Sequence, residues 1–413
     1  MKKKQLRWTL WTIASPFILF IILCILIYLP PIQNFLVDKA AVYASEATGM
    51  NISVGRISLS FPLNLVVTDV DAASPHKDTL LSVRRLQVNV QLLPLLKKQV
   101  EVDGISLQGA TVNSNDLIHG MRLNGTLGEL FISSHGVALD PETAIVNKVL
   151  LKDTDLSLCL NDTAAADTAA SDTTYWKIIL QDIDLQNVSF ALDMPLDSLS
   201  LAASLDNAIL RDGLIDLHKS AYSLQTFRIK NGRVRYDSGR PSATASADSL
   251  SAGLDPSHIA LTDIGVKLDS LYYEGRNMKA VISQFVLKER SGVEIVSTEG
   301  RLVSNDKVLR VPSLKLETRD SYLELNAAMD WDALDFKKEG LVSARLMADI
   351  GKPDVVRFMG SMDEKFIRKY PSEPLRIRTG IDGDLNKLKL TTLTAELPGA
   401  LELFAKGELT SLT

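Results

Sequence analysis

The stretch LQVNVQL, residues 86–92, alternates apolar and polar side chains without a break. Successive side chains of a β-strand point to opposite sides of a sheet, so this period of two predicts a strand with one apolar and one polar face. The same alternation returns many times from residue 51 onward. We therefore expect about 20 half-buried strands over residues 51–413.

A short unit of the form apolar-x-apolar-x-x-apolar-x-apolar repeats among these strands, at residues 100–107, 149–156, 178–185, 227–234 and 259–266. Its central step of three breaks strict alternation. Either a β-bulge keeps the flanking apolar residues on one face, or a two-residue hairpin turn places them opposite each other. We favour the bulge, because pairs such as Gln181 and Asp182 are unsuited to a turn that needs positive φ at both positions.

The fold class follows from these strands and from the scarcity of helices. Without helices for crossover connections, the sheet should be largely antiparallel, which excludes doubly wound and TIM-barrel folds. Aromatic residues make up 6% of the chain, too few for the girdles of a membrane barrel. We expect a mostly β protein with an elongated antiparallel sheet curled into a trough, while a sandwich and a solenoid remain open as alternatives.

An uncharged segment at residues 10–30 is long enough to cross a bilayer as a helix. Four basic residues precede it, in a tail at 1–9, which predicts a cytoplasmic N-terminus and a remaining chain outside the cytoplasm. A cleaved signal peptide is the competing interpretation, but the segment is longer than a signal core and no small-x-small site follows directly.

Three further segments interrupt the strand pattern. Residues 31–50 form an amphipathic linker helix by their spacing, with Gly49 at the C-cap position. The low-complexity stretch 161–174 predicts a flexible surface loop. A helix is expected near 353–370, between Pro353 and Pro371.

The search for chemistry is negative. The sequence contains no P-loop, dinucleotide fingerprint, nucleophile elbow or zinc-protease motif, and its five histidines are scattered. Asp182 and Asp184 have the spacing for one strand face, but we interpret them as a solvated turn. The net charge of -5 without a basic run argues against nucleic acid. We expect no enzyme activity, no cofactor and no metal.

The chain resembles the TamB branch of the AsmA-like proteins in its N-terminal part. The resemblance rests on the membrane segment running into residues 28–70, and on units such as VEVDGISLQGATVN, 100–113, and IILQDIDLQNVSFALD, 178–193. It implies an inner-membrane anchor, a periplasmic β-trough, and a role in outer-membrane biogenesis with phospholipid or an outer-membrane barrel protein as partner. Family members are usually longer and end in a C-terminal domain that this sequence does not show.

Three functions are compatible with this pattern. The first is a conduit that carries phospholipid between the inner and outer membranes along an apolar β-groove. The second is a scaffold or chaperone for outer-membrane and secreted proteins, and the third is a packed structural protein without a ligand. For the groove we predict lining by the inward residues of the best alternating strands, which are Leu86, Val88, Val90, Leu92, Ile183, Leu185, Ile264, Val266, Leu323 and Leu325.

Overall fold

The computed structural model describes residues 49–60, 64–74, 79–91, 102–114, 120–138, 142–161, 175–239, 253–335, 338–359, 364–384 and 387–410, and five residues between 39 and 46. The segment 10–30, the loop 162–174 and Leu92 lie outside these residues. Within them, no helix has the length and apolar character required to cross a membrane. The described residues between 39 and 46 are helical, and Gly49 has a φ of 69° and donates its N–H to the Ser45 carbonyl over 2.9 Å.

Nineteen strands form a single sheet, so the protein is mostly β. The first nine are β1 (Asn51–Ser60), β2 (Asn64–Ala73), β3 (Thr79–Val90), β4 (Val102–Asn113), β5 (Met121–Ala138), β6 (Thr143–Leu160), β7 (Lys177–Met194), β8 (Leu199–Asp216) and β9 (Ala221–Leu224). The remainder are β10 (Thr226–Ser238), β11 (His258–Glu274), β12 (Asn277–Glu289), β13 (Glu294–Ser304), β14 (Val308–Thr318), β15 (Tyr322–Asp330), β16 (Leu341–Ile350), β17 (Leu375–Asp384), β18 (Lys387–Leu397) and β19 (Leu401–Thr410).

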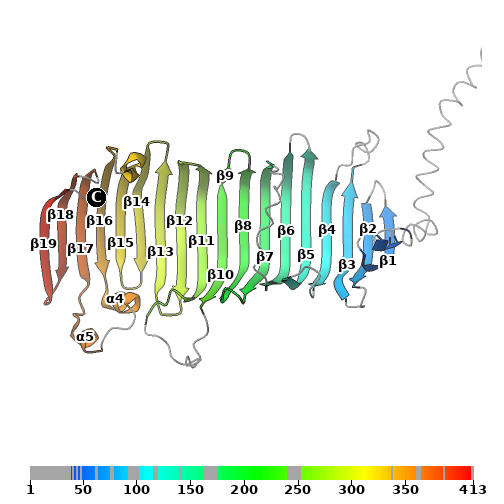
Figure 1. Ribbon diagram of the computed structural model, residues 1–413, viewed down its shortest axis with the longest axis horizontal. Helices are drawn as coiled ribbons and strands as arrows, with labels where there is room; N and C mark the ends of the chain where they lie inside the picture. Colours follow the sequence, from blue (N-terminus) through cyan, green and yellow to red (C-terminus); the bar gives the residue numbers. More distant parts are fainter. Residues whose placement is uncertain are drawn as a thin grey trace, which may run out of the picture.

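The strands follow one another across the sheet in chain order, from β1 to β19 (Figure 1). The short strand β9 and β10 share one position, because both pair with β8 on one side and β11 on the other. At about 4.8 Å per strand, the sheet is about 80 Å long in the direction perpendicular to its strands.

One pair departs from the antiparallel arrangement. β6 and β7 are parallel, with Thr143 opposite Lys177 and Cys159 opposite Asp193. A parallel pair needs a connection of a dozen or more residues, usually a helix. The 16 residues between these strands are enough for such a connection. The scarcity of helices in the sequence therefore predicted a largely antiparallel sheet but could not exclude one parallel pair.

The repeated unit is not a turn. A register shift, which is the mark of a bulge, occurs at the units 227–234 and 259–266, toward the next strand in each case, whereas the register continues unshifted through the units 149–156 and 178–185. Each unit that is fully described lies inside one strand, and the central residues Asp153, Asn231 and Asp263 have φ between 49° and 52°. In the unit at 178–185 the register of β7 with β8 passes over Gln181 and Asp212, whose φ is 51°. Because the chain continues straight through these irregular positions, β5 to β8 reach 18 residues each and are longer than expected.

The helical segment expected near 353–370 is described in two pieces, α4 (Lys352–Met359) and α5 (Glu364–Lys369). A short 3-10 helix, η1 (Trp331–Leu334), follows β15. Figure 1 shows α4 and α5 at the ends of the strands near β14 to β17, where they do not cover a face of the sheet.

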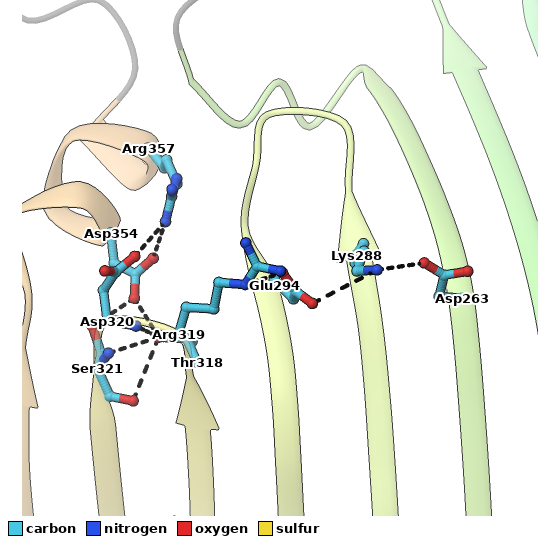
Figure 2. A network of polar contacts seen from close by, with 9 residues as sticks. All are labelled: Asp263, Lys288, Glu294, Thr318, Arg319, Asp320, Ser321, Asp354 and Arg357. Carbon is cyan, nitrogen blue, oxygen red and sulfur yellow. Dashed lines mark hydrogen bonds and ion pairs between the residues drawn. The ribbon is translucent and has the colours of Figure 1, made fainter.

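Helix α4 is held to the sheet by Asp354, whose side chain is 1% exposed. Its carboxylate accepts hydrogen bonds from the hydroxyls of Thr318 and Ser321, the latter at 2.6 Å, at the turn between β14 and β15. Arg357 donates to Asp354 over 3.0 Å and to Asp320 over 2.8 Å (Figure 2). Burial raises the pKa of Asp354, but these hydrogen bonds and the Arg357 charge outweigh it and hold the pKa below its ordinary value.

A second string of charges runs along the same edge of the sheet. Lys288 lies 2.8 Å from Asp263 and 3.8 Å from Glu294, which in turn pairs with Arg319 at 2.6 Å (Figure 2). These ion pairs tie the ends of β11, β12 and β13 to the end of β14. This edge is therefore fixed by polar contacts, because little apolar burial is available there.

Candidate functional site

The main candidate site is one entire face of the sheet. Its centre is a row of register partners that contains one residue from each strand position, from Leu59 in β1 to Ala405 in β19. We call it the long row, and 16 of its 18 members are apolar. It consists of Leu59, Leu65, Val88, Ile105, Ile132, Val149, Ile183, Leu210, Phe227, Leu268, Ile282, Gly300, Leu314, Leu325, Leu346, Thr379, Leu393 and Ala405.

A second row lies beside the long row, two residues away along each strand from β1 to β11. All of its members are apolar: Ile57, Val67, Leu86, Leu107, Leu130, Leu151, Leu185, Ala208, Ile229, Val266 and, in β12, Phe285. On the side away from the long row, its neighbours by one residue point to the opposite face and are all polar from β1 to β10. They are Arg56, Thr68, Arg85, Gln108, Glu129, Lys152, Gln186, Asn207 and Lys230. The neighbours on the other side are mixed and include Val66, Phe131, Leu150 and Ile209, so the opposite face, called the polar face below, is the more polar of the two.

The apolar face is not packed against a second layer within the described part of the chain. Every long-row residue is half-buried except Ile105, which is 37% exposed. Only ten apolar side chains of the described residues are buried, and five of them are alanines. Because soluble monomers rarely expose a continuous apolar surface of this extent, such a face is typical of a binding surface.

In β1 to β8 and in β10, one residue on the far side of the second row from the long row has no register partner in the neighbouring strand. These unpaired positions form a line across the sheet. At each step the register passes over one residue of both strands; we call this the bulge line, and it consists of Gly55, Asp69, Arg84, Gly109, Gly128, Asp153, Asn187, Asp206 and Asn231. Each strand thereby takes a step of three, such as Leu185 to Val188, and its apolar side chains stay on one face. The register is the same on both sides of this line, so each skipped residue of one strand faces one skipped residue of the next.

Beside the bulge line the apolar face is hollowed. A depression of about 240 Å³ lies over β7, β8, β10 and β11 and is lined mainly by apolar and small residues, among them Val188, Ala203, Leu205, Gly232 and Ile264. A larger residue at Gly232 would fill part of this depression, since its Cβ would lie 3.1 Å from the Cβ of Ile264. The small side chains give the face depth at this position.

The residues predicted to line a groove fall on this face. Val88, Ile183 and Leu325 belong to the long row, while Leu86, Leu185 and Val266 belong to the second row. The other three described residues are Leu323, next to Leu325 on the same side of β15, Val90, opposite Val102, and the buried Ile264.

The bulge line extends over more strands than the repeated units of the sequence indicate. Two of the five units, at 149–156 and 227–234, coincide with it, whereas the step occurs in nine strands. The signal was present as an Asp, Asn or Gly within many of the three-residue steps, because these residues adopt positive φ most easily.

Asp182 and Asp184 were placed wrongly at a turn. Both lie inside β7, and on the polar face they form ion pairs with Arg211 of β8, at 3.0 Å in the case of Asp184. Their spacing on one strand face is as expected. They serve to pair β7 with β8.

Among the described residues, no three side chains of the metal-binding types come together. His258 is hydrogen-bonded to Asp255 at 3.0 Å in the turn before β11.

Comparison with known proteins identified no relative of this chain. No protein-family model matches the chain, and no curated protein sequence matches it.

Proposed function

We propose that this chain is an inner-membrane-anchored periplasmic protein of the AsmA-like type that carries phospholipid between the inner and outer membranes. The observation that supports this most directly is the long row, which continues across all strand positions without a charged residue. An acyl chain, about 15 Å long, would cover only part of this row at a time and could move along it over about 80 Å. Binding of the acyl chain to the long row would be driven by the removal of its apolar surface, and that of the side chains beneath it, from water.

The function would be served by a sheet that curls about its long axis into a trough with the apolar face inside. The uncovered apolar face supports this shape, because curling would shield these side chains from water. Residues 10–30 would then anchor the trough in the inner membrane, with the described sheet in the periplasm.

A second candidate, a scaffold for outer-membrane proteins, is favoured by β19. This strand pairs with β18 only, among the described residues, and Leu401, Leu403 and Phe404 are 48%, 44% and 69% exposed. A strand of a barrel protein added to this edge would extend the sheet and cover these side chains. The third interpretation, a packed protein without a ligand, is the least supported, because no second sheet covers the apolar face within the described residues.

The experiment that separates these functions is photo-crosslinking in the bacterial envelope. A photoreactive amino acid replaces Ile183 or Leu325 in the long row, and Gln108 or Gln284 on the polar face, of the full chain. Phospholipid adducts at the long-row positions alone are expected for a conduit. Protein adducts without lipid would favour the scaffold, and the absence of any adduct would contradict both.

A further inference from the structure

The polar face of β12 to β16 carries a cluster of exposed basic side chains, which we call the basic cluster: Lys279, Arg301, Arg310, Lys315 and Arg345. They share one face by register. Lys279 and Arg310 are both register partners of Val303, and Arg301 is the register partner of Ser313. Lys315 is the register partner of Glu324 in β15, and the next strand, β16, carries Arg345. The same face of these strands also carries carboxylates, among them Glu299, Glu317 and Glu324, so the basic side chains are interspersed with acidic ones there, in a chain of net charge -5.

Two members of the basic cluster, Arg301 and Lys315, line a shallow depression. A hollow of about 380 Å³ is lined by Ser283, Glu299, Arg301, Ser313 and Lys315, with Ile282 and Gly300. The two serines and Gly300 are small, so that space is left between the longer side chains of Arg301 and Lys315. Such a space, bordered by a guanidinium, an ammonium and two hydroxyls, matches the groups that bind phosphate oxygens in proteins.

The backbone contributes to the same hollow. Pairing of β12 with β13 stops at Ile282 opposite Gly300 and resumes at Leu287 opposite Ile295. Residues 283–286 and 296–299 are therefore not paired with each other, although most of them pair with β11 or β14 on their other side, and the β12–β13 ladder is interrupted beside the hollow. Its shape depends on the sheet itself as well as on side-chain rotamers.

The charges of the basic cluster are not neutralised by ion pairs. Within the described residues none of its five members forms a salt bridge, whereas Arg211, Lys288, Arg357 and Arg378 all do. Ser283 donates its hydroxyl to Asp269, and Glu299 is the register partner of Lys315. Glu299 is the carboxylate that lines the hollow, so it should weaken anion binding by like-charge repulsion.

We propose that this hollow is a binding site for a phosphate group, with Arg301 and Lys315 as the main ligands. The site goes beyond the proposed function. Gly300 belongs to the long row, and Arg301, as the next residue, points to the opposite face, so phosphate binding here does not require an occupied apolar face. The same chemistry is offered by a free phosphate and by the phosphodiester of a phospholipid headgroup.

The test is calorimetric titration of the full chain, purified in an uncharged maltoside detergent. Pyrophosphate serves as the free-phosphate probe and glycerophosphoglycerol as the soluble headgroup probe. The double variant Arg301→Gln, Lys315→Gln is compared with Arg228→Gln, Lys267→Gln, which removes two charges from register partners on the same face outside the hollow. Circular dichroism confirms that each variant is folded.

We expect the first variant to weaken binding of at least one probe about tenfold or more, and the control by less than about twofold. The variant Glu299→Gln should bind the same probe several-fold more tightly, an effect that a purely structural role of the hollow does not produce. Preference for one probe identifies the source of the phosphate. Binding of neither probe, equal losses in both double variants, or no gain in Glu299→Gln would overturn the proposal.

Discussion

Gly128 of β5 lies opposite Asp153 of β6 so closely that a Cβ on Gly128 would be 2.8 Å from the Cβ of Asp153. Asp153 has a φ of 49°, which swings its Cβ toward the neighbouring strand. Gly55 and Asp69 repeat this relationship in β1 and β2, at 2.9 Å and a φ of 55°. In these two strand pairs the left-handed Asp faces a glycine of the preceding strand, where a larger side chain would overlap with it.

Substitution of Gly128 should therefore destabilise the sheet. Gly128→Val forces the backbones of β5 and β6 apart, and we expect a loss of roughly 1–3 kcal/mol in the free energy of unfolding. Urea denaturation of the full chain measures it. Gly407→Val in β19 is the matched control, because nothing lies within 4 Å of a Cβ built there; equal losses at both positions would refute the pairing.

Asn231 tests the left-handed conformation itself. Its φ is 52°, and its side-chain amide donates to Asp206 over 2.9 Å. A β-branched residue is strained at positive φ, so Asn231→Val should cost about 1–3 kcal/mol. Asn231→Gly tolerates the conformation and should retain most of the stability. If valine proved as stable as glycine in denaturation, the bulge line would not depend on residue type.

Asp354 predicts a pH-dependent stability of the edge that bears α4. Because the pKa of Asp354 is below its ordinary value of 3.8, its ionised form stabilises the folded state above that pH. This contribution falls as the pH drops through the folded-state pKa. Asp354→Asn should cost about 1–3 kcal/mol at pH 7, since it weakens the contacts to Ser321, Thr318 and Arg357.

The measurement for Asp354 is the denaturation midpoint of wild type and Asp354→Asn between pH 7 and pH 3. Their difference should shrink toward the acid end of the range. Glu373→Gln, at an exposed position between α5 and β17, is the control and should track wild type throughout. A constant difference across this range would show that the charge of Asp354 does not carry the effect.

Much of the fold could be read from the period of two. The alternation of Leu86, Val88 and Val90 placed β3, and the step of three in units such as 227–234 indicated bulges within continuous strands. The polar and apolar faces followed from the same pattern. Each of these features is local, so a short window of sequence is sufficient to reveal it.

The features that escaped prediction depend on neighbours in space. The parallel pairing of β6 with β7 is decided by the partner of each strand, and a window around Thr143 or Lys177 carries no information about it. Asp182 and Asp184 resemble turn residues by composition, but Arg211 across the strand pair keeps them in β7. The long row likewise emerges only when all registers are known.

Transport of phospholipid along this sheet requires that the long row be one continuous path. A photoreactive residue is placed at Leu65 near one end of the row and at Leu393 near the other, each with and without Leu210→Asp in the middle. We predict phospholipid adducts at both ends of the intact row, and loss of the adduct at one end when Asp interrupts it. Gln186→Asp on the polar face should change neither. Adducts that persist undiminished at both ends with Leu210→Asp, or that are absent from the intact row, would contradict a lipid path along this sheet.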